Sequence, residues 1–77
     1  MAKLDRITVE PGKMNGQPCI RGMRITVQRV LLAIAAYGMG EELRRAYPDL
    51  EDEDFRQALE YAAASVEDRV EDLAKAE

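Results

Sequence analysis

The spacing of apolar residues changes along this chain from a period of two to a period near 3.6, and the change marks its elements. Apolar and polar residues alternate in the β-branched segment Arg6–Val9, which predicts a short strand ended by Pro11-Gly12. Thr26 is placed to cap a following helix, and Gly38 to end it. The inward stripe predicted for that helix is Val27, Val30, Leu31, Ile34 and Ala35.

Two further helices are predicted beyond this first one. A short helix over Glu41–Ala46 lies between Gly40 and Pro48. Its inward residues are expected to be Leu43, Ala46 and Tyr47. A third helix begins near Glu51, with the carboxylates of residues 51–54 at the positive end of its dipole. Its apolar seam continues at spacings of three and four residues through Phe55, Leu59, Ala62, Val66, Val70 and Leu73.

The segment before the first predicted helix concentrates turn formers and arginines. Pro18 fixes its own φ and Gly22 tolerates positive φ, so Cys19-Ile20 and Arg24-Ile25 are expected to be extended pieces around a tight turn. The arginines at positions 21 and 24 are then expected to lie on a rigid turn and its extended flanks. They are either solvated hairpin charges or contacts to a phosphate or a partner.

Length and residue types restrict the function classes. A chain of 77 residues forms one small domain of modest stability, for which self-association is a natural remedy. The single cysteine, Cys19, fits a reducing cytoplasm, and the absence of histidine excludes a histidine-based triad and a histidine-containing zinc site. Because the longest apolar run, residues 30–36, is too short to cross a bilayer, we expect a soluble cytoplasmic protein without a membrane partner.

The net charge of −4 hides a division between two parts of the chain. Residues 1–48 carry eight basic and four acidic side chains, whereas residues 49–77 carry three basic and eleven acidic ones. A polyanion could therefore meet only the first part. The candidate DNA-binding residues are Lys13, Arg21, Arg24, Arg29, Arg44 and Arg45. Contacts of these side chains would be made to phosphates and would weaken with salt.

Three local features have simple structural interpretations that compete with chemical ones. The loop Gly12–Gly16 lacks the spacing of a phosphate-binding loop and is interpreted as a turn. Cys19 has no histidine to activate it and is interpreted as a packing residue. The carboxylates of residues 51–54 could form a metal cluster, but the helix dipole explains them without one. We therefore expect neither a metal nor another cofactor.

Two motifs carry a resemblance to a known family. Gly16–Val27, followed by Tyr47–Leu50 and the helix through Ala63, closely resembles the domain of unknown function 433 family over roughly residues 5–63. The resemblance implies a mainly α, homeodomain-like three-helix (helix-turn-helix) bundle with a short N-terminal β element. It also implies an antitoxin encoded beside a nuclease-type toxin with a PIN-like fold. The chain departs from the family pattern at Met23, Gly40 and Glu51, where threonine or serine is common.

Residues 64–77 lie outside this resemblance and form a second expected unit, an acidic amphipathic helical tail that adds an extended C-terminal helix to the antitoxin-like helix-turn-helix domain of residues 1–63. The tail either continues the third helix or starts a new one capped by Ser65. Its candidate partner-binding residues are Val66, Arg69, Val70 and Leu73. Since the implied toxins hold their metal with carboxylates, Arg69 is the first candidate for a cation that competes with that metal.

Three functions remain open at this stage: an antitoxin, a stand-alone DNA-binding regulator and an enzyme. An enzyme is the weakest, because no activated nucleophile or spaced carboxylate set is visible. Conventional DNA reading by the third helix is disfavoured, because its first turn would bring four carboxylates to the phosphates. We expect a homodimer formed at the edge of the first strand, a PIN-like toxin as partner, and operator DNA as a second ligand.

Overall fold

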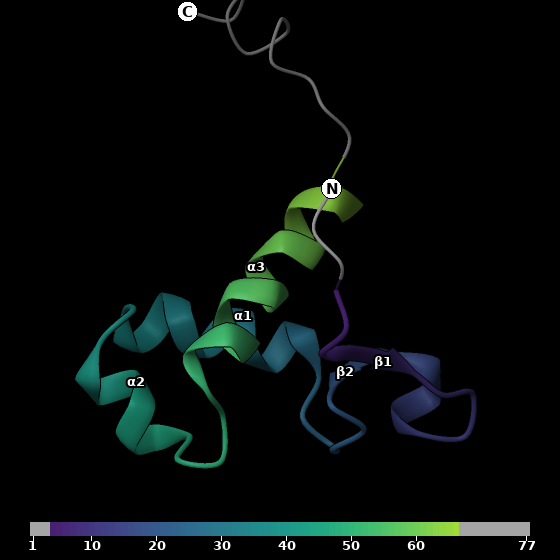
Figure 1. Ribbon diagram of the computed structural model, residues 1–77, viewed down its shortest axis with the longest axis horizontal. Helices are drawn as coiled ribbons and strands as arrows, with labels where there is room; N and C mark the ends of the chain where they lie inside the picture. Colours follow the sequence, from purple (N-terminus) through teal and green to yellow (C-terminus); the bar gives the residue numbers. More distant parts are fainter. Residues whose placement is uncertain (1–3, 67–77) are drawn as a thin grey trace, which may run out of the picture.

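The structure is a computed structural model that describes residues 4–66 as a two-stranded antiparallel sheet and three α-helices (Figure 1). The mainly α fold with a short N-terminal β element is confirmed. None of the helices in this range is long and apolar enough to cross a membrane. In chain order the elements are β1 (Ile7–Val9), the 3-10 turn η1 (Met14–Gly16), β2 (Pro18–Ile20), α1 (Val27–Tyr37), α2 (Glu41–Ala46) and α3 (Asp52–Ser65).

Local signals set both ends of α1 as predicted. The Thr26 hydroxyl accepts a hydrogen bond from the Arg29 amide at 3.1 Å, which satisfies one of the free donors of the first turn. At the other end Gly38 has a φ of 81° and donates its amide to the Ile34 carbonyl at 2.8 Å. Only glycine adopts this conformation without strain, so the helix ends there.

The predicted tight turn before α1 is also present. Arg21 and Gly22 have φ values of 47° and 71°, and the Met23 amide donates to the Ile20 carbonyl at 2.8 Å. Two central residues with positive φ are what a type I′ hairpin turn requires. The chain then returns alongside β2, because the Ile20 amide donates to the Ile25 carbonyl at 3.0 Å. The turn therefore joins β2 directly to the start of α1.

The core lies where α1 passes behind α3 in Figure 1 and where β2 and α2 meet these helices. The exposed fraction of Ile20, Leu43 and Phe55 is 1% or less, so each contributes a complete side chain to the apolar interior. The buried cluster consists of Ile20, Val27, Val30, Ala33, Leu43, Leu50, Phe55 and Ala58.

Three residues predicted to face inward are exposed instead: Ala35, Ala46 and Leu59. Their places in the core are taken by Ala33, Leu50 and Ala58. In α3, two buried polar residues explain why Leu59 is exposed. Asp54 and Gln57 are buried beside Phe55 and Ala58, so the helix turns its buried face toward these two residues and Leu59 leaves the core.

The helix α3 ends at Ser65, and Val66 has an extended backbone with φ −102° and ψ 132°. Val66 is 70% exposed. Of the two alternatives for the tail, a third helix that runs on through Val66 is wrong, because Val66 is extended. A new helix after Ser65 and the predicted tail residues Arg69, Val70 and Leu73 lie outside the described part of the chain.

Candidate functional site

The carboxylate of Asp54 is completely buried and lies at the centre of a cluster of charged groups. The Arg21 guanidinium donates to it from Nη2 at 2.8 Å and from Nε at 3.1 and 3.2 Å. Arg6 Nη1 donates at 3.1 Å, and the Glu51 amide at 2.7 Å. We call Asp54 with Arg6, Arg21 and Glu51 the Asp54 cluster. It ties the N-terminal hairpin to the start of α3.

The environment of Asp54 determines its protonation state. Burial alone raises the pKa of a carboxyl group, but the hydrogen bonds from Arg21, the Glu51 amide and Arg6 outweigh burial and hold the pKa of Asp54 below its usual value. The carboxylate is therefore ionised at neutral pH and pairs with two guanidinium groups. A buried charge of this kind is tolerated because its lone pairs are occupied.

Arg21 occupies an unusual backbone position for a residue with a Cβ. Its positive φ of 47° costs about 1–2 kcal/mol relative to a right-handed conformation. Its side chain offsets this strain by bonding Asp54 at two nitrogens and the Asp49 carbonyl at 2.9 Å. The sequence placed Arg21 among the candidate DNA contacts, but here its guanidinium is committed to the fold.

Gln57 extends the same connection on the other side of Arg6. Its Oε1 accepts the Arg6 amide at 2.8 Å, and its Nε2 donates to Asp5 at 2.9 Å and Glu53 at 2.8 Å. Gln57 is 2% exposed, so these three bonds satisfy an amide that would otherwise be costly to bury. The start of β1 is thus held to the middle of α3.

The other candidate cations divide into two groups. Lys13 contacts the Gly22 carbonyl and pairs with Glu10 at 3.6 Å, and Arg44 pairs with Asp52 at 2.9 Å. Arg24, Arg29 and Arg45 are exposed and have no ion-pair partner within residues 4–66. In the described range, half of the predicted cation set is therefore engaged within the chain.

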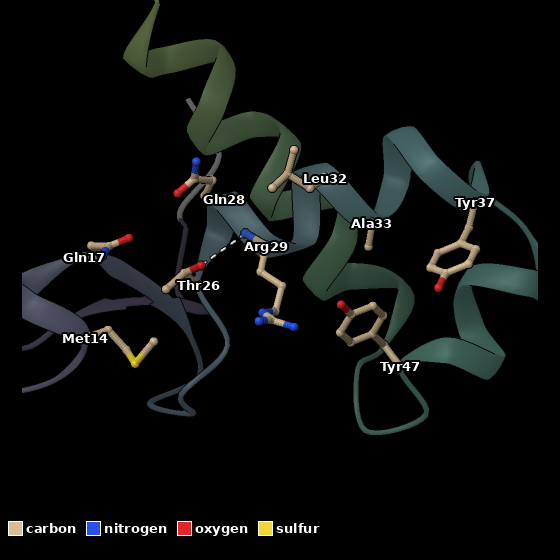
Figure 2. A pocket seen from close by; sticks show the side chains of 9 residues that line it. All are labelled: Met14, Gln17, Thr26, Gln28, Arg29, Leu32, Ala33, Tyr37 and Tyr47. Carbon is tan, nitrogen blue, oxygen red and sulfur yellow. Dashed lines mark hydrogen bonds between the residues drawn. The ribbon is translucent and has the colours of Figure 1, made fainter.

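A groove of about 520 Å³ runs along α1 between η1 and the turn that precedes α3 (Figure 2). In Figure 2 the Arg29 side chain points from α1 into the space between Met14 on one side and Tyr47 on the other. We call this site the α1 groove. It is lined by Met14, Gln17, Thr26, Gln28, Arg29, Leu32, Ala33, Tyr37 and Tyr47.

No acidic residue lines the α1 groove, although the chain carries 15 of them. Its polar side chains are one guanidinium, two phenols, two amides and the Thr26 hydroxyl, and all of them can donate hydrogen bonds. Its apolar part includes Leu32, which is 63% exposed, and the ring of Tyr37, which is 43% exposed. The groove is therefore suited to a ligand that combines negative charge with apolar surface.

The outer side of α3 has the opposite character. Arg56 pairs with Glu53 and, at 2.8 Å, with Glu60, and hydrogen bonds from Arg56 and Gln57 lower the pKa of Glu53 to about 2. The hydrogen bond from Arg44 likewise lowers the pKa of Asp52. The first half of α3 thus presents ionised carboxylates and a paired arginine. Further along, Leu59 is 41% exposed.

The family model for the protein of unknown function DUF433 matches residues 7–62, which include both β-strands and most of α3. The chain belongs to the DUF433 family. Searches of characterised proteins and of solved structures found no match. Within this DUF433 chain, the matched region contains Asp54, Arg21 and the whole α1 groove, whereas the tail beyond residue 62 lies outside it.

Sequence reasoning missed the central role of Asp54 and most residues of the α1 groove. The spacing of Glu51 and Asp54, three residues apart at a helix start, is a capping signal that could have singled out Asp54 among the four carboxylates. Gln57, three residues further along, lies on the same side of the helix. The groove has no comparable signal, because its lining comes from three separate segments.

Proposed function

We propose that this DUF433 chain is the antitoxin of a type II toxin–antitoxin pair and neutralises a PIN-like ribonuclease toxin. In this proposal α2 and α3 belong to a homeodomain-like helix-turn-helix scaffold, and the segment that follows α3 binds the toxin. The N-terminal hairpin, held by the Asp54 cluster, fixes the scaffold.

Exposed apolar residues at the end of α3 carry the proposal. Leu59 on α3 is 41% exposed, and Val66, directly after the last residue of α3, is 70% exposed. Val70 and Leu73 follow in the sequence as further apolar residues of the tail. Exposed apolar side chains at the end of a helix bury their surface when a partner covers them, and they are typical of docking segments.

The charges of α3 support protein binding over reading of DNA by this helix. Asp52 and Glu53 are ionised at its N-terminal end, where a recognition helix would approach the bases, and Arg56 is paired with two glutamates. A phosphate backbone would be repelled at this position.

The proposal is tested first by identifying the neighbouring reading frame and, where it encodes a small nuclease, by purifying that protein. We expect the full chain to bind this nuclease and suppress its cleavage of RNA. Arg69→Ala should reduce inhibition by about tenfold while weakening binding less, because the cation acts on the carboxylates that hold the metal. Lys75→Ala, a second cation of the tail, is the matched control and should inhibit nearly as well as the unchanged chain.

Truncation after Ala64 gives a complementary variant, since the core contacts in the described range end at Tyr61. The shortened chain should keep its helical circular dichroism and lose neutralisation. A full chain that neither binds nor inhibits the nuclease would contradict the antitoxin role.

A stand-alone DNA-binding regulator is the second candidate, and the exposed arginines Arg24, Arg29 and Arg45 favour it. These side chains have no ion pairs within residues 4–66 and could contact phosphates. Two findings together would favour this candidate. The gene would have no nuclease-encoding neighbour, and the chain would bind duplex DNA with an affinity that falls with salt and in Arg24→Ala. Asp54 should be left unchanged in such tests, because its removal breaks the Asp54 cluster.

A further inference from the structure

The α1 groove is a mixed site whose chemistry restricts its occupant. Arg29 supplies a positive charge, the phenols of Tyr37 and Tyr47 supply donors, and Leu32 with the tyrosine rings supplies apolar surface. An occupant that satisfies all of these groups carries carboxylates next to apolar side chains.

The chain itself contains a segment of this composition. Residues 67–77 carry five acidic and two basic side chains, and Val70 and Leu73 stand three residues apart among the acids. We propose that the α1 groove of one copy holds residues 67–77 of a second copy, with carboxylates on Arg29 and the two apolar side chains against Leu32 and the tyrosine rings. This inference does not depend on a toxin.

The direction of α3 favours a second copy over the same chain. Figure 1 shows α3 rising away from α2 and the loop before α3, so that the C-terminal end of α3 lies far from α2. The helix has 14 residues and is about 21 Å long. A segment returning to its own groove would use about six residues, at about 3.5 Å each, to retrace that length. Val70, the fifth residue after Ser65, would then still lie within that retraced length, so Val70 and Leu73 could not both reach the groove of their own chain.

A nucleic acid is a poorer match for the same groove. Residues 4–66 carry eight basic and ten acidic side chains, and five of the eight basic ones have ion-pair partners in that range. Duplex binding rests on several phosphate contacts at once, which this balance does not favour. A short acidic segment needs only the local charge of Arg29.

In the proposed dimer each copy places its residues 67–77 in the α1 groove of the other copy, so charge reversal on either side tests the contact. In sedimentation equilibrium, Arg29→Glu should raise the dimer dissociation constant by about tenfold or more, because both symmetry-related contacts become repulsive. A second variant, with Glu67, Asp68, Glu71 and Asp72 each changed to Lys, should be weakened in the same way. An equimolar mixture of the two variants should form heterodimers, because each groove then meets a segment of opposite charge.

Arg45→Glu is the matched control, since Arg45 is also exposed, lies outside the α1 groove and has no ion pair in residues 4–66; its dimer constant should be unchanged. Circular dichroism shows whether each variant keeps its helices. A full chain that stays monomeric, or a mixture without heterodimers, overturns the inference. A dimer insensitive to Arg29→Glu places the interface elsewhere, such as the edge of β1, and also overturns it.

Discussion

Arg21 and Arg29 follow each other closely in sequence but lie in opposite surroundings. Arg21 bonds the buried carboxylate of Asp54 through two nitrogens and contributes to the fold. Arg29 lies in a groove without acidic residues, where its guanidinium has no ion-pair partner in the described range. The sequence alone gives both arginines the same positive charge and does not show which of them is already paired. The comparison shows that the charge available to a ligand is set by which carboxylates the fold brings to each arginine.

The largest effect expected from this comparison follows loss of the Asp54 carboxylate. Asp54→Ala leaves Arg6 and Arg21 without their shared partner and the Glu51 amide without its acceptor. We expect a loss of about 3–5 kcal/mol in the free energy of unfolding, measured by urea denaturation. For a chain of this size that corresponds to a fall in Tm on the order of 20–30 °C.

Asp52→Ala is the matched control for this variant. Asp52 also lies in the first turn of α3 and also pairs with an arginine, but both side chains of that pair are more than half exposed. Exposed pairs contribute little, so a much smaller loss is expected. Equal losses in the two variants would show that the Asp54 cluster is no more important than a surface pair.

A smaller effect is expected on the pH dependence of stability. Because the pKa of Asp54 is lowered in the folded chain, the unfolded chain takes up the proton first as the pH falls below about 5. The contribution of Asp54 is therefore complete at neutral pH and is lost as the pH falls through the folded pKa. Asp54→Asn should flatten the dependence of the urea midpoint between about pH 5 and pH 3.

Asp52 and Glu53 also have lowered pKa values, so part of the acid dependence should remain in Asp54→Asn. An unchanged profile in this variant would mean that Asp54 does not titrate differently in the folded and unfolded chains.

The smallest effect is expected in the groove. Arg29→Gln removes a charge that bonds no carboxylate in residues 4–66, and the cap contact to Thr26 uses the Arg29 backbone amide, which the substitution keeps. The free energy of unfolding should change by less than about 0.5 kcal/mol in urea denaturation. A loss comparable to that of Asp54→Ala would show that Arg29 has a structural partner and would end the contrast with Arg21.

Much of the fold could be predicted because its signals are local. The Thr26 cap, the Gly38 stop and the tight turn at Gly22 each depend on neighbours within a few residues. The burial and double arginine pairing of Asp54 depend on Arg21, which lies 33 residues earlier, so the local capping spacing at positions 51–54 does not by itself predict them. The α1 groove could not be predicted for the same reason, since Met14 and Tyr47 meet only through tertiary packing.

The bond between the Arg6 amide and Gln57, 51 residues later, has a consequence for synthesis. While the chain leaves the ribosome, β1 and the Arg21 turn emerge first and have no partner for their guanidinium groups or for the Arg6 amide. Residues 51–57 supply these partners together, late in translation. We therefore expect the local pairing of β1 with β2 to gain its contacts to the rest of the domain only after α3 has emerged.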